Sequence, residues 1–290
     1  MATTELAVGS PRDRRRRPLR FFFIFMVAAS LAILSLAFVP EFIAYAQGAF
    51  LIAPILHVHA AIMMAWVAAF AVQAYLGAKG KIVQHQRAGR IAFAIGWLAW
   101  ASMVFVEWRA MIVHPLPDKL AGYDELLAGP YIYLTFPIFL AWAYHERQRP
   151  MWHKRLMLFA LFLSLGAAVQ RYVWLPMTDS RAGYWAIAAF IDVALLLPLV
   201  IFDLITLRGR LHPATARGIV VLFSAQAIML SLWGSSAWRE FAYNLSHAIR
   251  RFVLSANARD GSKADSRTLL QQSFASRHLL PIRNGSFLRP

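Results

Sequence analysis

Long runs of apolar residues, separated by short loops rich in lysine and arginine, recur along the chain and constrain its fold more than any other feature. Each run has roughly 20 residues, the length of helix that crosses a hydrocarbon core about 30 Å thick. A crossing segment must be helical, because lipid offers the backbone no hydrogen-bond partner. With 59% hydrophobic and 15% charged residues, the chain is predicted to be an all-α, polytopic transmembrane helix bundle. We expect it in the cell inner (plasma) membrane as a multi-pass protein.

Proline and glycine residues interrupt the apolar runs and divide them into about seven spans. Breaks are expected at Pro40, around Gly77 and at Pro150, for example, because proline and glycine weaken helix interiors. The predicted spans are 20–39, 51–76, 91–113, 130–146, 154–175, 184–206 and 216–237. Residues 20–237 would then form the bundle, preceded by a basic tail over residues 1–19.

The distribution of lysine and arginine predicts a cytoplasmic N-terminus. Seventeen basic residues fall in the N-terminal segment and the loops on the same side of the seven spans, against three on the opposite side. Short loops rich in lysine and arginine stay in the cytoplasm. The formal net charge of +16 is then explained by topology and by the lipid bilayer, whose anionic headgroups are the expected partner. No specific nucleic-acid-reading module is present, and the oligomeric state is left open.

The C-terminal region changes character after the last span. Residues 238–254 carry apolar side chains at helical spacing beside Arg250 and Arg251, a pattern typical of an amphipathic interfacial helix. Residues 255–290 are rich in serine, arginine and asparagine, which predicts disorder. Nine basic residues lie beyond residue 238, which runs against the charge rule if this tail is outside.

The second span contains two histidines in the stretch LHVHAAIMMAW. His57 and His59 are about 200° apart on a helix, so they face different ways. The row that follows His57 is made of alanines, which predicts close helix packing. Ionisable groups within spans are usually functional or paired, and we expect Arg171 and Asp192 to form such a pair. The residues predicted to line an outward-facing polar cavity are His59, Met63, Trp66, Glu107, Arg109, Arg171 and Asp192.

Three cytoplasmic turns each combine a histidine with a basic cluster. The histidines His85 and His153 should lie at similar height, where imidazoles on different helices can ligate haem or a metal. Anchoring to headgroups is the simpler interpretation. The candidate haem or metal ligands are His57, His59, His85 and His153. The residues expected to contact anionic headgroups are Arg87, Arg90, Lys154, Arg155, Arg210 and His212.

Several short motifs occur together between about residues 50 and 240. They are H-x3-M-x2-W at His59, H-x3-G at His85, HKRLM at 153–157 and GRLHPAT at 209–215. This set resembles a group of predicted bacterial multi-pass membrane proteins of unassigned activity. The resemblance implies a membrane topology and marks these positions, but it supplies no substrate.

Motifs of common enzymes are absent, so an enzyme is not the favoured interpretation and no catalytic residue is assigned. The chain has no P-loop, no H-E-x-x-H and no G-x-S-x-G motif. It also has no cysteine, which excludes thiolate metal sites and disulfides. The favoured function is binding or transport of a small ligand or ion through the outward-facing cavity. The alternatives are a b-type haem protein that transfers electrons through histidine ligands, and a structural or assembly subunit.

Overall fold

A computed structural model describes residues 11–48, 52–113, 120–169 and 181–259, and within these residues every regular element is a helix. In chain order the elements are α1 (Pro11–Ala46), α2 (Pro54–Ala78), α3 (Ile82–Val113), η1 (Leu120–Leu127), α4 (Ala128–His145), η2 (Glu146–Gln148), α5 (Pro150–Val169), α6 (Arg181–Thr206), α7 (Pro213–Leu232) and α8 (Ser236–Arg259). The prediction of an all-α chain is confirmed for the part that the structure describes.

Helices α1 to α7 correspond to the seven apolar runs, but their ends differ from the predicted boundaries. Helix α1 continues through Pro40 to Ala46, so the predicted break at this proline is wrong. Membrane helices tolerate proline, because neighbouring helices and local adjustments satisfy the freed backbone groups. Helix α3 begins at Ile82, so most of the stretch expected as the loop 77–90 is its first turns. As a result, His85 lies on ordered helical backbone.

Prolines begin four of the described helices, and glycines shape the turns between them. Pro54 and Pro213 occupy the first turns of α2 and α7, where a missing N–H leaves no hydrogen bond unmade. The α2–α3 turn contains Gly80 at φ +71°, and the α6–α7 turn contains Gly209 at φ +80°. Glycine adopts this left-handed conformation without steric cost. These turns allow the chain to reverse within a few residues.

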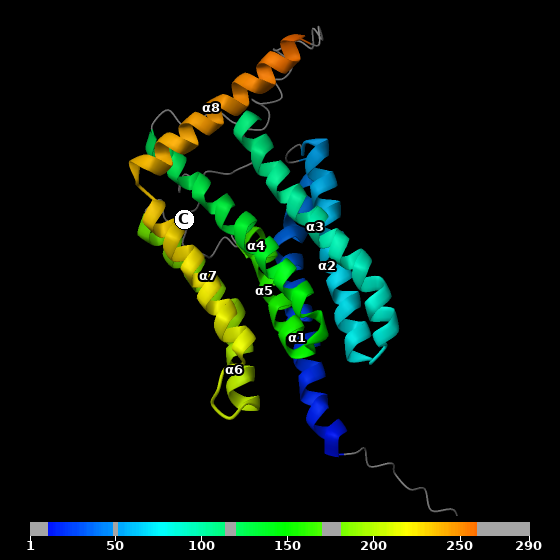
Figure 1. Ribbon diagram of the computed structural model, residues 1–290. Coiled ribbons are helices and arrows are strands. Elements are labelled where there is room, and N and C mark those ends of the chain that lie inside the picture. Colours follow the sequence, from blue (N-terminus) through cyan, green and yellow to red (C-terminus); the bar gives the residue numbers. More distant parts are fainter. Residues whose placement is uncertain (1–10, 49–51, 114–119, 170–180, 260–290) are drawn as a thin grey trace, which may run out of the picture.

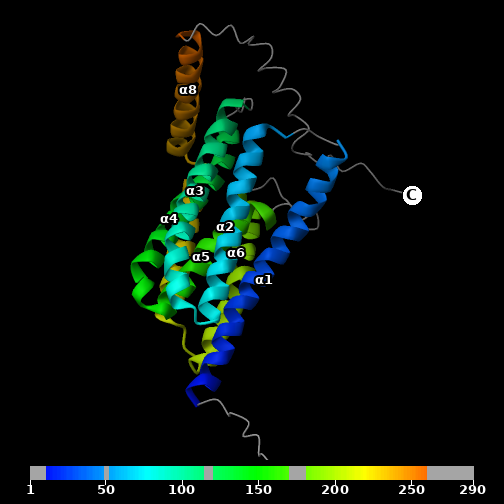
Figure 2. The ribbon, with the colours of Figure 1, turned by 90° about the vertical axis from the view of Figure 1, so that its right-hand side faces the viewer.

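The helices form two antiparallel hairpins, α2–α3 and α4–α5, with the remaining helices around them (Figure 1). Helix α1 packs against α2 and α5, and Figure 2 shows it from the side. Helices α6 and α7 also pack against α5, and Phe202 of α6 stacks on Phe22 of α1. Helix α8 crosses the end of the bundle and contacts η1 and α3 (Figure 1). Helix α5 is therefore the central helix of the bundle.

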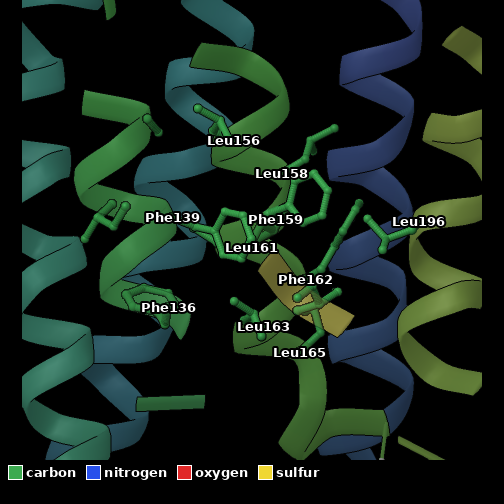
Figure 3. Close-up of a cluster of buried hydrophobic side chains, with 14 of the residues drawn as sticks. Phe136, Phe139, Leu156, Leu158, Phe159, Leu161, Phe162, Leu163, Leu165 and Leu196 are labelled. Carbon is green, nitrogen blue, oxygen red and sulfur yellow. The ribbon is translucent and has the colours of Figure 1, made fainter. Parts of the chain in front are cut away.

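The core is centred on α5, whose side chains from Leu156 to Leu165 are almost all buried. Figure 3 shows these side chains meeting others from α4 and α6. Phe139 and Phe159 stack with ring centroids 4.8 Å apart. Helix α7 approaches this stack closely at Gly218, where an added Cβ would lie 2.6 Å from the Phe159 ring. Larger residues at position 218 would therefore push α7 away from α5.

The outer surface of the bundle is apolar. Large hydrophobic side chains are exposed on all sides of it, among them Phe21, Val72, Ile91, Ile205 and Val220. Soluble monomers rarely expose so much apolar surface, whereas lipid solvates it well. Four helical segments are long and apolar enough to cross a membrane: Phe21–Ala46, Pro54–Ala78, Ile82–Arg109 and Pro213–Leu232. The chain is thus built to be embedded in a membrane.

Candidate functional site

The first turns of α3 and α5 bring His85 and His153 together at one end of the bundle. Their ring centroids are 6.3 Å apart and the ring planes are 85° apart. Both side chains are half-buried. Two residues separated by 68 positions in the chain meet here because the two hairpins lie with their turns at the same end (Figure 1). The structure thus brings these two histidines together, while their position at the inner face of the membrane stays a prediction.

Each of the two imidazoles has its Nδ1 atom next to a backbone carbonyl. Nδ1 of His153 lies 2.8 Å from the Ala143 oxygen, and Nδ1 of His85 lies 3.1 Å from the Gln73 oxygen. An Nδ1–H group that donates to such a carbonyl leaves the Nε2 lone pair available. Histidines that bind metals are held in this way, with the second nitrogen donating to a carbonyl or carboxylate.

The side chain of Gln73 links α2 to the first turns of α3. The amide can be oriented so that both its nitrogen and its oxygen form hydrogen bonds. The nitrogen then donates to the His85 carbonyl at 3.0 Å, and the oxygen accepts from Gly89 N–H at 3.2 Å. In this orientation the nitrogen also donates to Nδ1 of His85 at 2.8 Å, which places the His85 ring proton on Nε2. Ligation of a metal through this Nε2 requires the opposite orientation of the amide, in which Nδ1–H of His85 donates. The tautomer of His85 is therefore coupled to the orientation of the Gln73 amide. This role of Gln73 could not be predicted from the sequence.

Burial lowers the pKa of His153 below its ordinary value, and nearby His85 and Lys154 act in the same direction. The hydrogen bond to the Ala143 carbonyl opposes this shift. His153 therefore stays neutral in the folded protein to a lower pH than in the unfolded chain. A neutral imidazole is the form that ligates iron and other metals.

Protein stability should fall as the solution is acidified from pH 7.5 to pH 5.5. The unfolded chain takes up a proton on His153 near the ordinary pKa of about 6.5, while the folded bundle resists it, so protons favour unfolding. We expect the unfolding midpoint in detergent to drop by a few degrees over this range. His153→Asn keeps a donor for the Ala143 carbonyl without titrating, and should reduce the drop. The surface variant His247→Asn is the control, and an equal drop in all three proteins would contradict the assignment.

A buried ion pair lies near the same end of the bundle and joins α5 to α6. Arg155 donates through Nε to both carboxylate oxygens of Asp203 at 3.1 and 3.3 Å, and Nη2 donates to Oδ1. Both side chains are fully buried. The carboxylate also accepts from Thr215 Oγ1 and from the His212 backbone N–H. The prediction that Arg155 contacts lipid headgroups is wrong, because Asp203 and the Met151 carbonyl take up its donors inside the bundle.

The other predicted headgroup contacts fall into two groups. His212 caps α7, since its Nδ1 accepts from the Ala214 N–H at 3.1 Å. Lys154 lies with Nζ 5.1 Å from the centre of the Phe23 ring. The remaining three, Arg87, Arg90 and Arg210, are exposed. Contact with lipid headgroups stays a prediction for these three.

At the opposite end of the α2–α3 hairpin, the predicted cavity residues join different helices. Nδ1 of His59 is 3.1 Å from Ser102 Oγ, and Tyr133 donates to Glu107 at 3.2 Å. Trp66 donates to Ser164 at 3.4 Å. Met63 and Arg109 are half-buried. Arg171 and the side chain of Asp192 lie outside the described residues, as does the pair predicted between them.

His57 is exposed and lies beside α1, with Nε2 3.3 Å from the Tyr45 hydroxyl. The alanines that follow it on the same row, including Ala61 and Ala65, are also exposed. The predicted close packing along this row is therefore wrong, because α1 contacts α2 near His57 and the alanines face outward. His57 and His59 each have a partner on a different helix, so the structure does not bring them into one site.

Protein side chains alone do not form a metal centre in the part of the chain described. No group of three or more histidine, cysteine, aspartate or glutamate residues is arranged to hold an ion there. The His85–His153 pair offers only two ligands. A porphyrin supplies the in-plane ligands of its iron and leaves the axial positions to the protein. A pair of histidines thus fits haem better than a bare ion.

The fold and these sites define a class, namely an all-helical protein embedded in a membrane, with a histidine pair at one end of its bundle. No protein family, curated protein or solved structure matches the chain.

Proposed function

We propose that the chain is a seven-span protein of the plasma membrane, with a cytoplasmic N-terminus, that binds haem b between His85 and His153 and takes part in electron transfer. The observation that carries this proposal is the separation of the two rings, 6.3 Å between centroids. Two imidazoles on opposite sides of one metal, with metal–nitrogen bonds of about 2.0–2.1 Å, place their ring centres about 6 Å apart. A direct hydrogen bond between the two rings would require them to be closer.

The surroundings of the pair also support haem ligation. The Gln73 and Ala143 carbonyls lie within hydrogen-bond distance of the two Nδ1 atoms and can orient each ring. Such hydrogen bonds raise the basicity of an imidazole ligand and help to set the reduction potential. When bound, haem b supplies a one-electron couple. The histidine pair and the two carbonyls are this chain's contribution to it.

The test is the absorption spectrum of the purified protein. We expect a Soret band that shifts on reduction with dithionite, and the band should be lost in His85→Ala and His153→Ala. His247→Ala removes a histidine from α8 and should keep the band. Added imidazole should restore it in the alanine variants by replacing the missing ligand. A folded protein that stays colourless and free of iron after incubation with haemin would contradict the proposal.

A second proposal concerns the opposite end of the bundle, where a small ligand or ion would bind near His59 and Glu107. Its support is the half-buried Glu107 carboxylate within the candidate span Ile82–Arg109, since intramembrane carboxylates usually serve a function. Glu107→Gln keeps an acceptor for the Tyr133 hydroxyl. If this variant unfolds no more easily than the original but loses ligand-induced thermal stabilisation, binding is supported. A loss of stability alone would favour the structural alternative.

A further inference from the structure

Helix α8 is amphipathic in an unusual way, because it has two apolar faces and one polar face. At 100° per residue, Trp238, Ala242 and Ser246 share one face. Phe241, Leu245, Ala248 and Phe252 share a second face, about a quarter-turn away from the first. The remaining arc carries charged and polar residues, including Glu240, Asn244 and Arg251. The two apolar faces have different surroundings in the structure.

The first apolar face is covered by the protein itself. Ala242 and Ser246 are buried where α8 packs against η1 and α3. The Trp238 indole N–H donates to the Tyr123 carbonyl at 3.0 Å. Arg239 donates to both oxygens of Asp124, at 3.1 Å from Nε and at 2.6 Å from Nη2. These contacts fix the rotation of α8 about its axis, and thereby the direction of its second face.

The second apolar face is uncovered. The exposed fraction is 56% for Phe241, 40% for Leu245 and 72% for Phe252. We name these residues, together with Ala248, the apolar stripe. Transfer of exposed phenylalanine and leucine side chains from water to an apolar environment is favourable, so the stripe favours such an environment. Something other than the described chain must cover it.

The start of α8 follows directly on a candidate membrane span. The candidate span in α7 ends at Leu232, and α8 begins at Ser236, so α8 starts where the chain leaves the membrane. The helix then crosses the end of the bundle (Figure 1). Arg251 lies beside the stripe on its polar side, where it supplies the positive charge that anionic headgroups attract.

From these observations we infer that α8 is a lipid-binding helix, with the apolar stripe inserted at the headgroup boundary of the same bilayer and Arg251 bound to anionic phospholipid. The helix is held at the correct rotation by Asp124 and Tyr123. This inference does not depend on haem binding. Binding of α8 at the end of the bundle would then depend on the lipid composition of the membrane.

The absence of cysteine from the chain allows a direct test. Single cysteines at Leu245, Ala248 and Phe252, and matched controls at Glu240 and Asn244, would carry a nitroxide label in full-length protein reconstituted into nanodiscs. Oxygen concentrates in lipid, whereas a nickel chelate stays in water. We expect the ratio of oxygen to nickel accessibility to be several-fold higher on the stripe than at the controls. Leu245 and Asn244 are neighbours in sequence, which makes their comparison especially strict.

The lipid arm compares nanodiscs of phosphatidylcholine alone with discs that also contain phosphatidylglycerol. Anionic lipid should increase the difference between stripe and controls, and Arg251→Gln should remove that increase. Equal ratios at Leu245 and Asn244 would show that the stripe faces water and would overturn the inference. Protection of the stripe from both reagents would also overturn it, because a protein partner or a second copy would then cover this face.

Discussion

Asp203→Leu is expected to destabilise the protein by about 3–5 kcal/mol, the usual result when one member of a buried ion pair is removed. The substitution would leave the Arg155 guanidinium charged, buried and without its carboxylate. It would also remove the acceptor for Thr215 Oγ1 and for the His212 N–H. The effect is measured by thermal unfolding in detergent. Unfolding is monitored as the loss of the monodisperse peak in size-exclusion chromatography.

The double variant Arg155→Met with Asp203→Leu separates the ion pair from general packing. Replacing both charges with apolar residues of similar size is often neutral or stabilising, so much of the lost stability should return. Arg210→Met removes an exposed arginine near the same end of the bundle and is the control for loss of charge. A double variant as unstable as Asp203→Leu would show that the network matters for reasons other than the unpaired charge.

Trp66→Ala should cost about 3–5 kcal/mol, as large-to-small changes in tightly packed cores do. Trp66 is only 1% exposed and its ring lies 5.7 Å from that of Phe136. Helix α3 makes room for it at Gly96, where a Cβ would come within 2.8 Å of the indole. The same unfolding assay applies, with Met64→Ala as the control, since Met64 is 65% exposed on the same helix.

The Trp66 variant also tests the cavity predicted from sequence. If Trp66 lined a water-filled cavity, truncation would remove few packing contacts and the loss of stability would be small. A change of less than about 1 kcal/mol would therefore favour the cavity, since truncation of a well-packed tryptophan costs several times more. A large change supports packing as its main role.

The positions of the helices could be predicted because the hydrophobic runs and the prolines are local features. Pro54, Pro150 and Pro213 each begin a helix close to a predicted boundary. Helix lengths were harder to predict. Hydropathy marks only the part of a helix that lies in lipid, and helical backbone can continue beyond it. Arg87 and Arg90 made the start of α3 look like a loop, although charged residues are good helix formers outside the hydrocarbon.

The side-chain partners could be predicted only in part. A shared height for His85 and His153 followed from their places in two equivalent turns. The partner of a buried charge depends on which helices are neighbours, and the order of helices along the chain does not determine this. Depth alone suggested Arg171 with Asp192 and left Arg155 at the surface, whereas packing of α5 against α6 brings Arg155 to Asp203. Gln73 was missed because its contact with Gly89 requires the tight α2–α3 turn.

The separation of Arg155 and Asp203 in the chain has a consequence for biosynthesis. The aspartate is 48 residues downstream of the arginine, so the ribosome delivers α5 to the insertion machinery well before its counter-charge exists. Until α6 has been translated, the guanidinium must remain at the aqueous edge of the bilayer or be shielded by a chaperone. The final packing of α5 is therefore expected to follow the insertion of α6. The bundle would then assemble only after α6 has been translated.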